Sequence, residues 1–313
     1  MFNRRFLRAK VFQELYAYSQ DEEPQYSLHE KSLLKSLSKA YELYFYLLSM
    51  PSEFRFFVGK QLENEQAKYY PRESIINPLK AIYQNKAILK LEESELLKSR
   101  VKTYHLKWLN TDDLFKSVWH ELKSNPFFEK YGDAPEHTFT EDRKALSEIY
   151  QIIIGESELF NAYMEELFIN WEDDQTVVTS FLLKAIDKMK ENSRDEYIGI
   201  AADDAEDRQF MCDLFSQTVE KNEELTAYIA SKTKNWEPDR IAVSDLLLMK
   251  LALCEILNFP YVPVKVSINE YLELAKLYST PNSHGFINGI LDKVQLDLRK
   301  NHKIEKLGRG LVE

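Results

Sequence analysis

The sequence predicts an all-α protein. Apolar residues recur at spacings of three and four along most of its 313 residues, which is the period of an amphipathic helix. Eight glycines and ten prolines are few for this length, so long continuous elements are favoured over many tight turns. The alternation typical of strands never lasts beyond a few residues, as at Tyr197–Ile200. We therefore expect helices throughout the chain.

The first helix is predicted over residues 4–19. Its apolar side chains share one face and can dock on the rest of the protein: Leu7, Val11 and Leu15. The basic residues near its start lie outside this apolar stripe. We therefore expect them to be exposed.

A long helix is predicted next. Ser27 and Glu30 have the spacing of a capping box, which indicates a helix start, and the apolar rhythm then continues to about Met50. Pro51 is expected to begin a new helix, because proline suits a first helical turn. Further helices are predicted over residues 52–68, 78–90, 93–108 and 112–124.

Residues 125–135 are the predicted linker. The segment has two prolines and Gly132, and it loses the helical period. Thr138 and Glu141 then form a second capping-box pattern, which predicts the start of another helix.

An internal repeat becomes visible when the sequence is shifted by 65 residues without gaps. Twelve of 42 positions agree, and the matches include Asp142 with Asp207 and Tyr163 with Tyr228. One interpretation is a duplicated helical hairpin, with a diverged copy at about 139–190. The other is coincidence between two sets of amphipathic helices.

Composition indicates a globular protein of the cytoplasm. Hydrophobic residues make up 44% and charged residues 29%, and no apolar run approaches the roughly 18 residues of a membrane span. The first eight residues lack the apolar stretch of a signal peptide. Cys212 and Cys254 alone support neither a disulfide framework nor a four-ligand zinc site. The six histidines have no metal-binding spacing, so we expect neither a metal nor another cofactor.

Charge is unevenly distributed within the net charge of −10. Acidic residues outnumber basic ones by 24 to 10 between positions 141 and 239, so the chain ends are the basic parts. Four basic residues open the chain without an acid among them: Arg4, Arg5, Arg8 and Lys10. A basic tail is expected over residues 301–313. This pattern favours local anion binding, and arginines near a chain end can contact RNA phosphates or bases.

One acidic cluster suggests a different chemistry. Asp203, Asp204 and Asp207 match the D-D-x-x-D pattern with which all-helical isoprenoid enzymes hold magnesium and a diphosphate. No second acidic motif accompanies it. The plainer interpretation is a negatively charged first turn of a helix, which the helix dipole favours.

The last eighty residues are the most informative part of the chain. A helix is predicted from Pro263 to Tyr278, then a turn, then a second helix through Phe286–Asp292. Polar residues and a glycine interrupt the apolar rhythm of these helices. We expect Asn269, Asn288 and Gly289 to be structural. Asn282, Ser283 and His284 are expected to be exposed at the turn.

These segments resemble the NusB transcription antitermination family. The resemblance rests on PVKVSINEYLELAK at 263–276, FINGILDK at 286–293, the helix from Asp239 to Leu257 and RRFLRAK at 4–10. It covers about 205–300 and 1–19, and it leaves out about 21–200. The implied organisation is an N-terminal helix at 1–20, a helical insertion at 21–200, a NusB-like core at 201–300 and the basic tail.

The resemblance implies a non-enzymatic helical factor with two packed subdomains. Members of the family bind boxA-type nascent RNA together with NusE, a ribosomal protein. They join the RNA polymerase elongation complex with other Nus factors and suppress termination, chiefly in ribosomal RNA operons. The family also allows a homodimer.

By position, the resemblance assigns RNA contacts to the basic N-terminus (Arg4, Arg5, Arg8 and Lys10) and to Asn282, Ser283 and Phe286 near the turn. Asp245 and Lys250 fall on the helix that faces NusE. Gly285 stands where the family commonly has lysine, and Asn282 where it commonly has an acid, so the local charge near RNA is altered.

Of three alternatives, the first is disfavoured and the other two remain open. A NusB-like domain also occurs in some RNA methyltransferases, but no glycine-rich S-adenosylmethionine-binding domain follows residue 300. The acidic cluster leaves a magnesium-dependent isoprenoid-type enzyme open. The third alternative is a helical protein-interaction module without RNA binding.

Overall fold

The computed structural model describes residues 2–199, 205–233 and 241–311, and within these ranges it contains helices and no strand. The prediction of an all-α fold is therefore confirmed. None of the described helices combines the length and the apolar character that a membrane span requires. The chain divides into two compact units. Unit 1 comprises residues 1–37 and 203–313, and unit 2 comprises residues 38–202.

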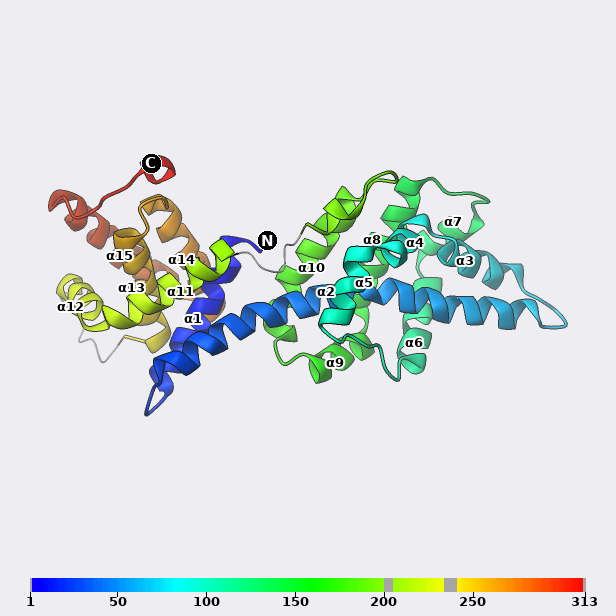
Figure 1. Ribbon diagram of the computed structural model, residues 1–313, viewed down its shortest axis with the longest axis horizontal. Coiled ribbons are helices and arrows are strands. Elements are labelled where there is room, and N and C mark those ends of the chain that lie inside the picture. The colour runs from blue at the N-terminus through cyan, green and yellow to red at the C-terminus, as the bar shows by residue number, and fades with distance from the viewer. Residues whose placement is uncertain (1, 200–204, 234–240, 312–313) are drawn as a thin grey trace. The chain divides into compact units, whose positions relative to one another are not determined.

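Unit 1 is built around α13 (Val243–Asn258). This helix contacts α1 (Arg4–Gln20), α11 (Ala205–Glu220), α12 (Asn222–Lys232), α14 (Val264–Tyr278) and α15 (Ser283–Lys300). Figure 1 shows α14 and α15 beside it. Apolar residues surround α13 on nearly all sides, and helices of this composition are stable only when buried. The start of α2 (Tyr26–Gln66) also belongs to unit 1.

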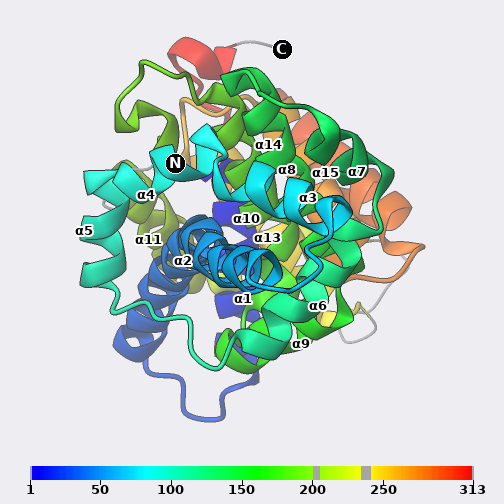
Figure 2. The same ribbon diagram turned by 90° about the vertical axis from the view of Figure 1, so that its right-hand side faces the viewer.

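Unit 2 holds the remainder of α2 and a set of shorter helices. These are α3 (Glu73–Tyr83), α4 (Lys86–Glu93), α5 (Glu95–Thr103), α6 (Asp112–Lys123), α7 (Pro126–Asp133), α8 (Phe139–Glu156), α9 (Glu158–Leu167), α10 (Trp171–Lys188) and the 3-10 helix η1 (Asp195–Ile198). Seen along α2, they surround this helix (Figure 2). Its residues Leu43, Phe45 and Leu47 are fully buried, so α2 forms the centre of the unit 2 core.

Pro51 lies inside α2, so the predicted helix break there is wrong. An internal proline removes the hydrogen bond to the carbonyl four residues earlier, here that of Leu47. The Tyr150 hydroxyl donates to this carbonyl oxygen at 2.7 Å and replaces the missing donor. Burial of residues 43–51 and this substitute donor explain why α2 continues through the proline. α2 begins at Tyr26, so Ser27 lies within its first turn rather than before it, where a capping residue would stand.

The predicted linker at 125–135 is also wrong, because α7 occupies most of it. Asn125 caps this helix by accepting a hydrogen bond from the Phe127 N–H at 2.8 Å, and Pro126 occupies the first helical position. Asparagine followed by proline is thus a helix start here. In contrast, the capping box of Thr138 and Glu141 is confirmed.

Two predicted helices have different boundaries because of side-chain caps. The Asn85 side chain accepts from the Ile88 N–H at 2.9 Å and starts α4, which divides the predicted 78–90 helix. Ser94 likewise accepts from the Leu97 N–H at 3.1 Å and starts α5. Such caps satisfy amide groups that a helix start would otherwise leave unpaired.

Residues after α15 return to the loop between α13 and α14. The Leu307 N–H donates to the Pro260 carbonyl at 3.0 Å, and the Lys306 ammonium donates to the Phe259 carbonyl at 2.9 Å. Burial lowers the pKa of Lys306 to about 8. A side chain at Gly310 would collide with Pro260, so glycine permits this close approach. This tail is therefore packed on unit 1.

Candidate nucleic-acid interface

Arg5 is exposed at the start of α1 and lies against α14. The Asn3 side chain caps α1 by accepting from the Phe6 N–H at 2.8 Å, which fixes where the helix begins. The Arg5 guanidinium donates to both carboxylate oxygens of Glu270 at 2.9 and 3.0 Å. Its side chain is nevertheless 44% exposed. This arginine is thus oriented and still accessible.

Arg4 is the second accessible arginine. Its side chain is 40% exposed, and one guanidinium nitrogen lies 3.7 Å from a carboxylate oxygen of the buried Asp207. The guanidinium carbon also lies 4.5 Å from the centre of the Phe210 ring, a cation–π arrangement. Both contacts come from α11, so α11 sets the direction of Arg4.

Arg8 is buried and belongs to an internal hydrogen-bond network. It donates to both carboxylate oxygens of Glu255 at 2.8 Å, and its side chain is only 3% exposed. The hydroxyls of Ser267 and Tyr271 also donate to Glu255, at 2.7 and 3.2 Å. Burial alone would lower the pKa of Arg8, but its bonds with Glu255 outweigh that effect and raise it. Arg8 therefore fixes α1 against α13 and α14.

Lys10 is buried as well. Its ammonium nitrogen lies 5.2 Å from the centre of the Phe6 ring. The four basic residues singled out in the sequence thus separate into exposed Arg4 and Arg5 and buried Arg8 and Lys10.

The turn between α14 and α15 presents a similar division. Asn282 is exposed and Phe286 is partly exposed, but Ser283 is buried. The Ser283 hydroxyl forms hydrogen bonds with those of Ser279 and Thr280, at 3.0 and 2.8 Å. The expectation that Ser283 is exposed is wrong, because this hydroxyl network draws it inward. Gly285 is exposed, and a side chain there would meet open space.

Arg5 and the turn are both connected to α14. Glu273 accepts a hydrogen bond from Lys276, and Arg5 and His284 act on it through space, which together lower its pKa. Farther along α1, Gln13 donates to the Tyr278 hydroxyl at 3.2 Å. The structure therefore brings both ends of the chain to one helix of unit 1.

Asp245 and Lys250 are buried, in contrast to what a direct partner contact requires. Asp245 accepts a hydrogen bond from the Ser279 hydroxyl. The Lys250 ammonium donates to the Asn222 side-chain oxygen at 2.7 Å, and burial lowers the pKa of Lys250. Both polar groups thus have partners inside unit 1.

Sequence reasoning missed two exposed apolar residues close to Asp245. Tyr16 and Val243 are exposed and line a shallow pocket of about 510 Å3 together with Phe12 and Tyr278. Exposed apolar groups gathered around a pocket are typical of interaction sites. One feature of the sequence could have indicated this pocket: Tyr16 lies outside the apolar stripe of α1.

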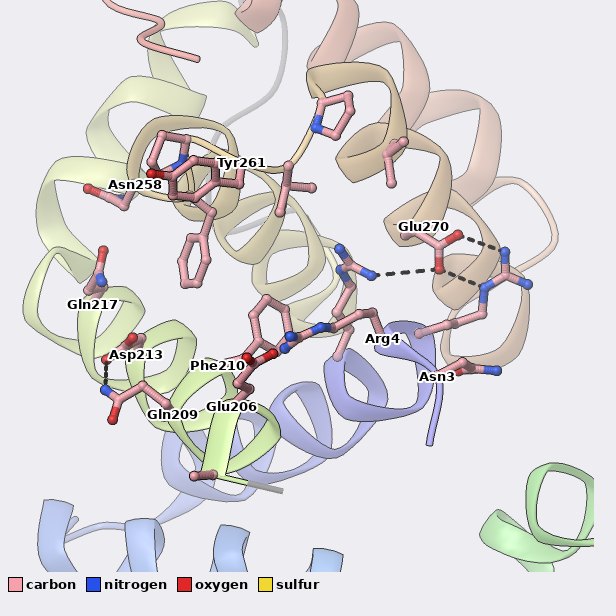
Figure 3. A pocket seen from close by; sticks show the side chains of 18 residues that line it. Asn3, Arg4, Glu206, Gln209, Phe210, Asp213, Gln217, Asn258, Tyr261 and Glu270 are labelled. Carbon is pink, nitrogen blue, oxygen red and sulfur yellow. Dashed lines mark hydrogen bonds and ion pairs between the residues drawn. The ribbon is translucent and has the colours of Figure 1, made fainter. Parts of the chain in front are cut away.

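A larger cleft opens beside Arg4 and Arg5. Its volume is about 1400 Å3, and its walls come from α1, α11, α14 and the loop between α13 and α14. Figure 3 shows Tyr261 and Asn258 on one side of it and Phe210 with Arg4 on the other.

The proposed magnesium cluster is only partly described by the structure. Asp203 and Asp204 lie outside the described residues, and Asp207 is buried against Arg4. Among the residues that are described, no group of three acidic, histidine or cysteine side chains could hold a metal ion.

Comparisons with known proteins point in one direction. The model of the NusB family matches residues 175–296. A transcription antitermination protein NusB from Salinibacter ruber is 43% identical over 110 residues, which are 35% of this chain and 69% of the relative. NusB from Chloroherpeton thalassium is 38% identical over 110 residues, 35% of this chain and 52% of the relative. NusB from Natranaerobius thermophilus is 42% identical over 92 residues, 29% of this chain and 66% of the relative. No solved structure matches the chain.

Proposed function

This chain belongs to the NusB family, and we propose that it acts in transcription antitermination by binding boxA-type RNA together with NusE. The similar proteins are named for transcription antitermination. In this proposal the complex joins the elongating RNA polymerase with other Nus factors and acts on ribosomal RNA transcription.

The RNA contacts are assigned to the accessible part of the predicted site. Arg4 and Arg5 would bind phosphates, and the turn with Asn282 and Phe286 would contact bases or sugars. Arg8, Lys10 and Ser283 are buried, so their contribution would be to hold α1 and the turn in place. The single observation that supports this best is that the accessible Arg5 pairs with Glu270 of α14, the helix that leads into the turn.

The partner surface is assigned to Tyr16 and Val243, with Asp245 and Lys250 supporting it from inside unit 1. Apolar side chains at the centre of an interface contribute more binding energy than rim charges. Replacing Val243 by Glu should abolish NusE binding and leave RNA binding unchanged in the absence of NusE. Retention of NusE binding would contradict the assigned surface.

RNA binding is tested with labelled boxA RNA titrated at several salt concentrations. The double variant Arg4→Ala, Arg5→Ala should bind more weakly. Its salt dependence should also fall by about 0.7 in slope for each lost phosphate contact. The matched control is Arg72→Ala, because Arg72 is an exposed arginine of unit 2 paired with Glu65, as Arg5 is with Glu270. Equal affinity and equal slope for wild type and the double variant would refute the proposal.

A further inference from the structure

The cleft beside Arg4 and Arg5 has a lining that suits an unpaired nucleobase. Tyr261 is 67% exposed, a large exposure for an aromatic side chain in a concave site. Phe210 lies beneath the Arg4 guanidinium. Aromatic rings and arginine planes are the surfaces on which proteins stack single-stranded bases.

Polar groups of the cleft can meet the edge of a base. The amide of Gln217, from α11, faces this cleft and has no hydrogen-bond partner among the described residues. An amide offers both a donor and an acceptor. In contrast, Asn258 already donates to the Cys254 carbonyl at 2.8 Å, and Asp213 accepts from Gln209 at 2.6 Å. Gln217 is therefore the side chain placed to read a base edge.

Charge orients the ligand within the cleft. Arg4 and Arg5 stand where α1 borders it, whereas Glu206 and Asp213 line the α11 wall. Carboxylates repel a phosphate but accept hydrogen bonds from base amino groups. This distribution of charge favours a nucleotide with its phosphate at the arginines and its base inside the cleft.

The Tyr261 platform is held in place before any ligand binds. The tail donates from Leu307 to the Pro260 carbonyl and from Lys306 to the Phe259 carbonyl. A side chain atom added at Gly308 would lie 3.5 Å from the Tyr261 ring, so the ring packs on the tail backbone. A platform ordered in advance loses little conformational entropy on binding.

We propose that one nucleotide of the bound RNA turns its base into this cleft, stacks on Tyr261 and keeps its phosphate at Arg4 and Arg5. This inference rests on the RNA-binding function proposed above. It adds a pocket for one base to the phosphate contacts of Arg4 and Arg5 and to the base or sugar contacts proposed for the turn.

The test combines protein variants with a series of boxA RNAs in which one base at a time is removed. Tyr261→Ala should weaken binding of intact RNA by roughly tenfold, the usual effect of losing one stacked base. Tyr261→Phe should bind like wild type, because stacking needs the ring and not the hydroxyl. Tyr70→Ala is the control, since Tyr70 is an exposed tyrosine of unit 2. The midpoint temperatures of thermal unfolding of all variants are measured first and should be equal.

Two further readouts separate stacking from loss of charge. Tyr261→Ala should leave the salt slope unchanged, unlike the arginine variants. In wild type, one base-free RNA should bind about tenfold more weakly, and Tyr261→Ala should show no added loss with that RNA. The wild-type series needs no variant, so it tests the pocket even if Tyr261→Ala is unstable.

The outcomes distinguish the two proposals. If the arginine variants lose affinity but Tyr261→Ala and every base-free RNA bind normally, the pocket is refuted and the RNA-binding function stands. If wild type binds no RNA with or without NusE, the proposed function is refuted and the pocket with it.

Discussion

The helices at about 139–190 in unit 2 and those 65 residues later in unit 1 carry matching residues. One matched aspartate nevertheless has different partners in the two sets. Asp142, in the first turn of α8, accepts hydrogen bonds from the Lys86 N–H at 2.8 Å and the Tyr131 hydroxyl at 2.6 Å. Asp207, in the first turn of α11, faces the Arg4 guanidinium. Neutral donors satisfy the first carboxylate, whereas a cation that still reaches solvent pairs with the second.

The same shift of 65 residues relates apolar residues of the two sets, but their burial agrees only in part. Buried Leu182 of α10 matches buried Leu247 of α13, but buried Val178 matches exposed Val243. The duplicated hairpin, with its diverged copy at about 139–190, therefore stays a hypothesis beside coincidence between two sets of amphipathic helices. What differs is exposure: Val243 of unit 1 is accessible, whereas the matching Val178 of unit 2 is buried.

The largest expected effect concerns the charged anchor of unit 1. Arg8→Ala would leave the buried Glu255 carboxylate without its cation, which costs about 3–5 kcal/mol of unfolding free energy. Arg5→Ala removes an exposed pair with Glu270 and should cost at most about 1 kcal/mol. Urea unfolding followed by circular dichroism measures both. Similar losses for the two variants would show that Arg8 is not the anchor.

A smaller effect is expected where the two sets differ by one hydroxyl. Tyr150 of unit 2 matches Phe215 of unit 1, and only Tyr150 supplies a donor at an internal proline. Tyr150→Phe should cost about 1–3 kcal/mol, because the Leu47 carbonyl loses its partner. Pro51→Ala restores a backbone N–H for that carbonyl. The loss measured by urea unfolding should therefore shrink in the Pro51→Ala background, and an equal loss in both backgrounds would contradict this account.

The smallest effect is the pH dependence contributed by one matched position that is charged in unit 1 and apolar in unit 2. Lys250 matches Ala185 of unit 2, and burial lowers the pKa of Lys250 below its ordinary value of 10.5. The unfolded chain then binds more protons between the two pKa values, so unfolding free energy rises with pH in that window. Lys250→Met should reduce this rise, measured near neutral pH and just below pH 10.5, while the partly buried Lys306 keeps its own share of it. Lys265→Met, at an exposed position of α14, is the control and should behave like wild type.

Local patterns predicted much of the fold. The stripe of Leu7, Val11 and Leu15 correctly predicted α1, and Pro263 correctly marked the start of α14. The sequence could not show that α2 continues through Pro51, because the compensating hydroxyl comes from Tyr150, far along the chain. Tertiary contacts decided that point.

The candidate site shows the same limit. Arg4 and Arg8 are one helical turn apart and share a face, so helical spacing alone does not distinguish them. Their difference comes from Glu255, which lies 247 residues after Arg8 and draws it inside. Burial of Asp245 and Lys250 likewise depends on partners from other helices. Helical spacing predicts which side chains share a face but not what covers that face.

The tail on the loop between α13 and α14 also bears on how the protein should be shortened for study. The family match ends at residue 296, whereas contacts with Pro260 and the Tyr261 ring come from residues 307–310. A fragment trimmed to the family match would lose the last turn of α15 and the support beneath Tyr261. If the cleft takes a base as proposed, such a fragment would bind RNA more weakly than the full chain, so a fragment made to test the proposal should extend beyond residue 296.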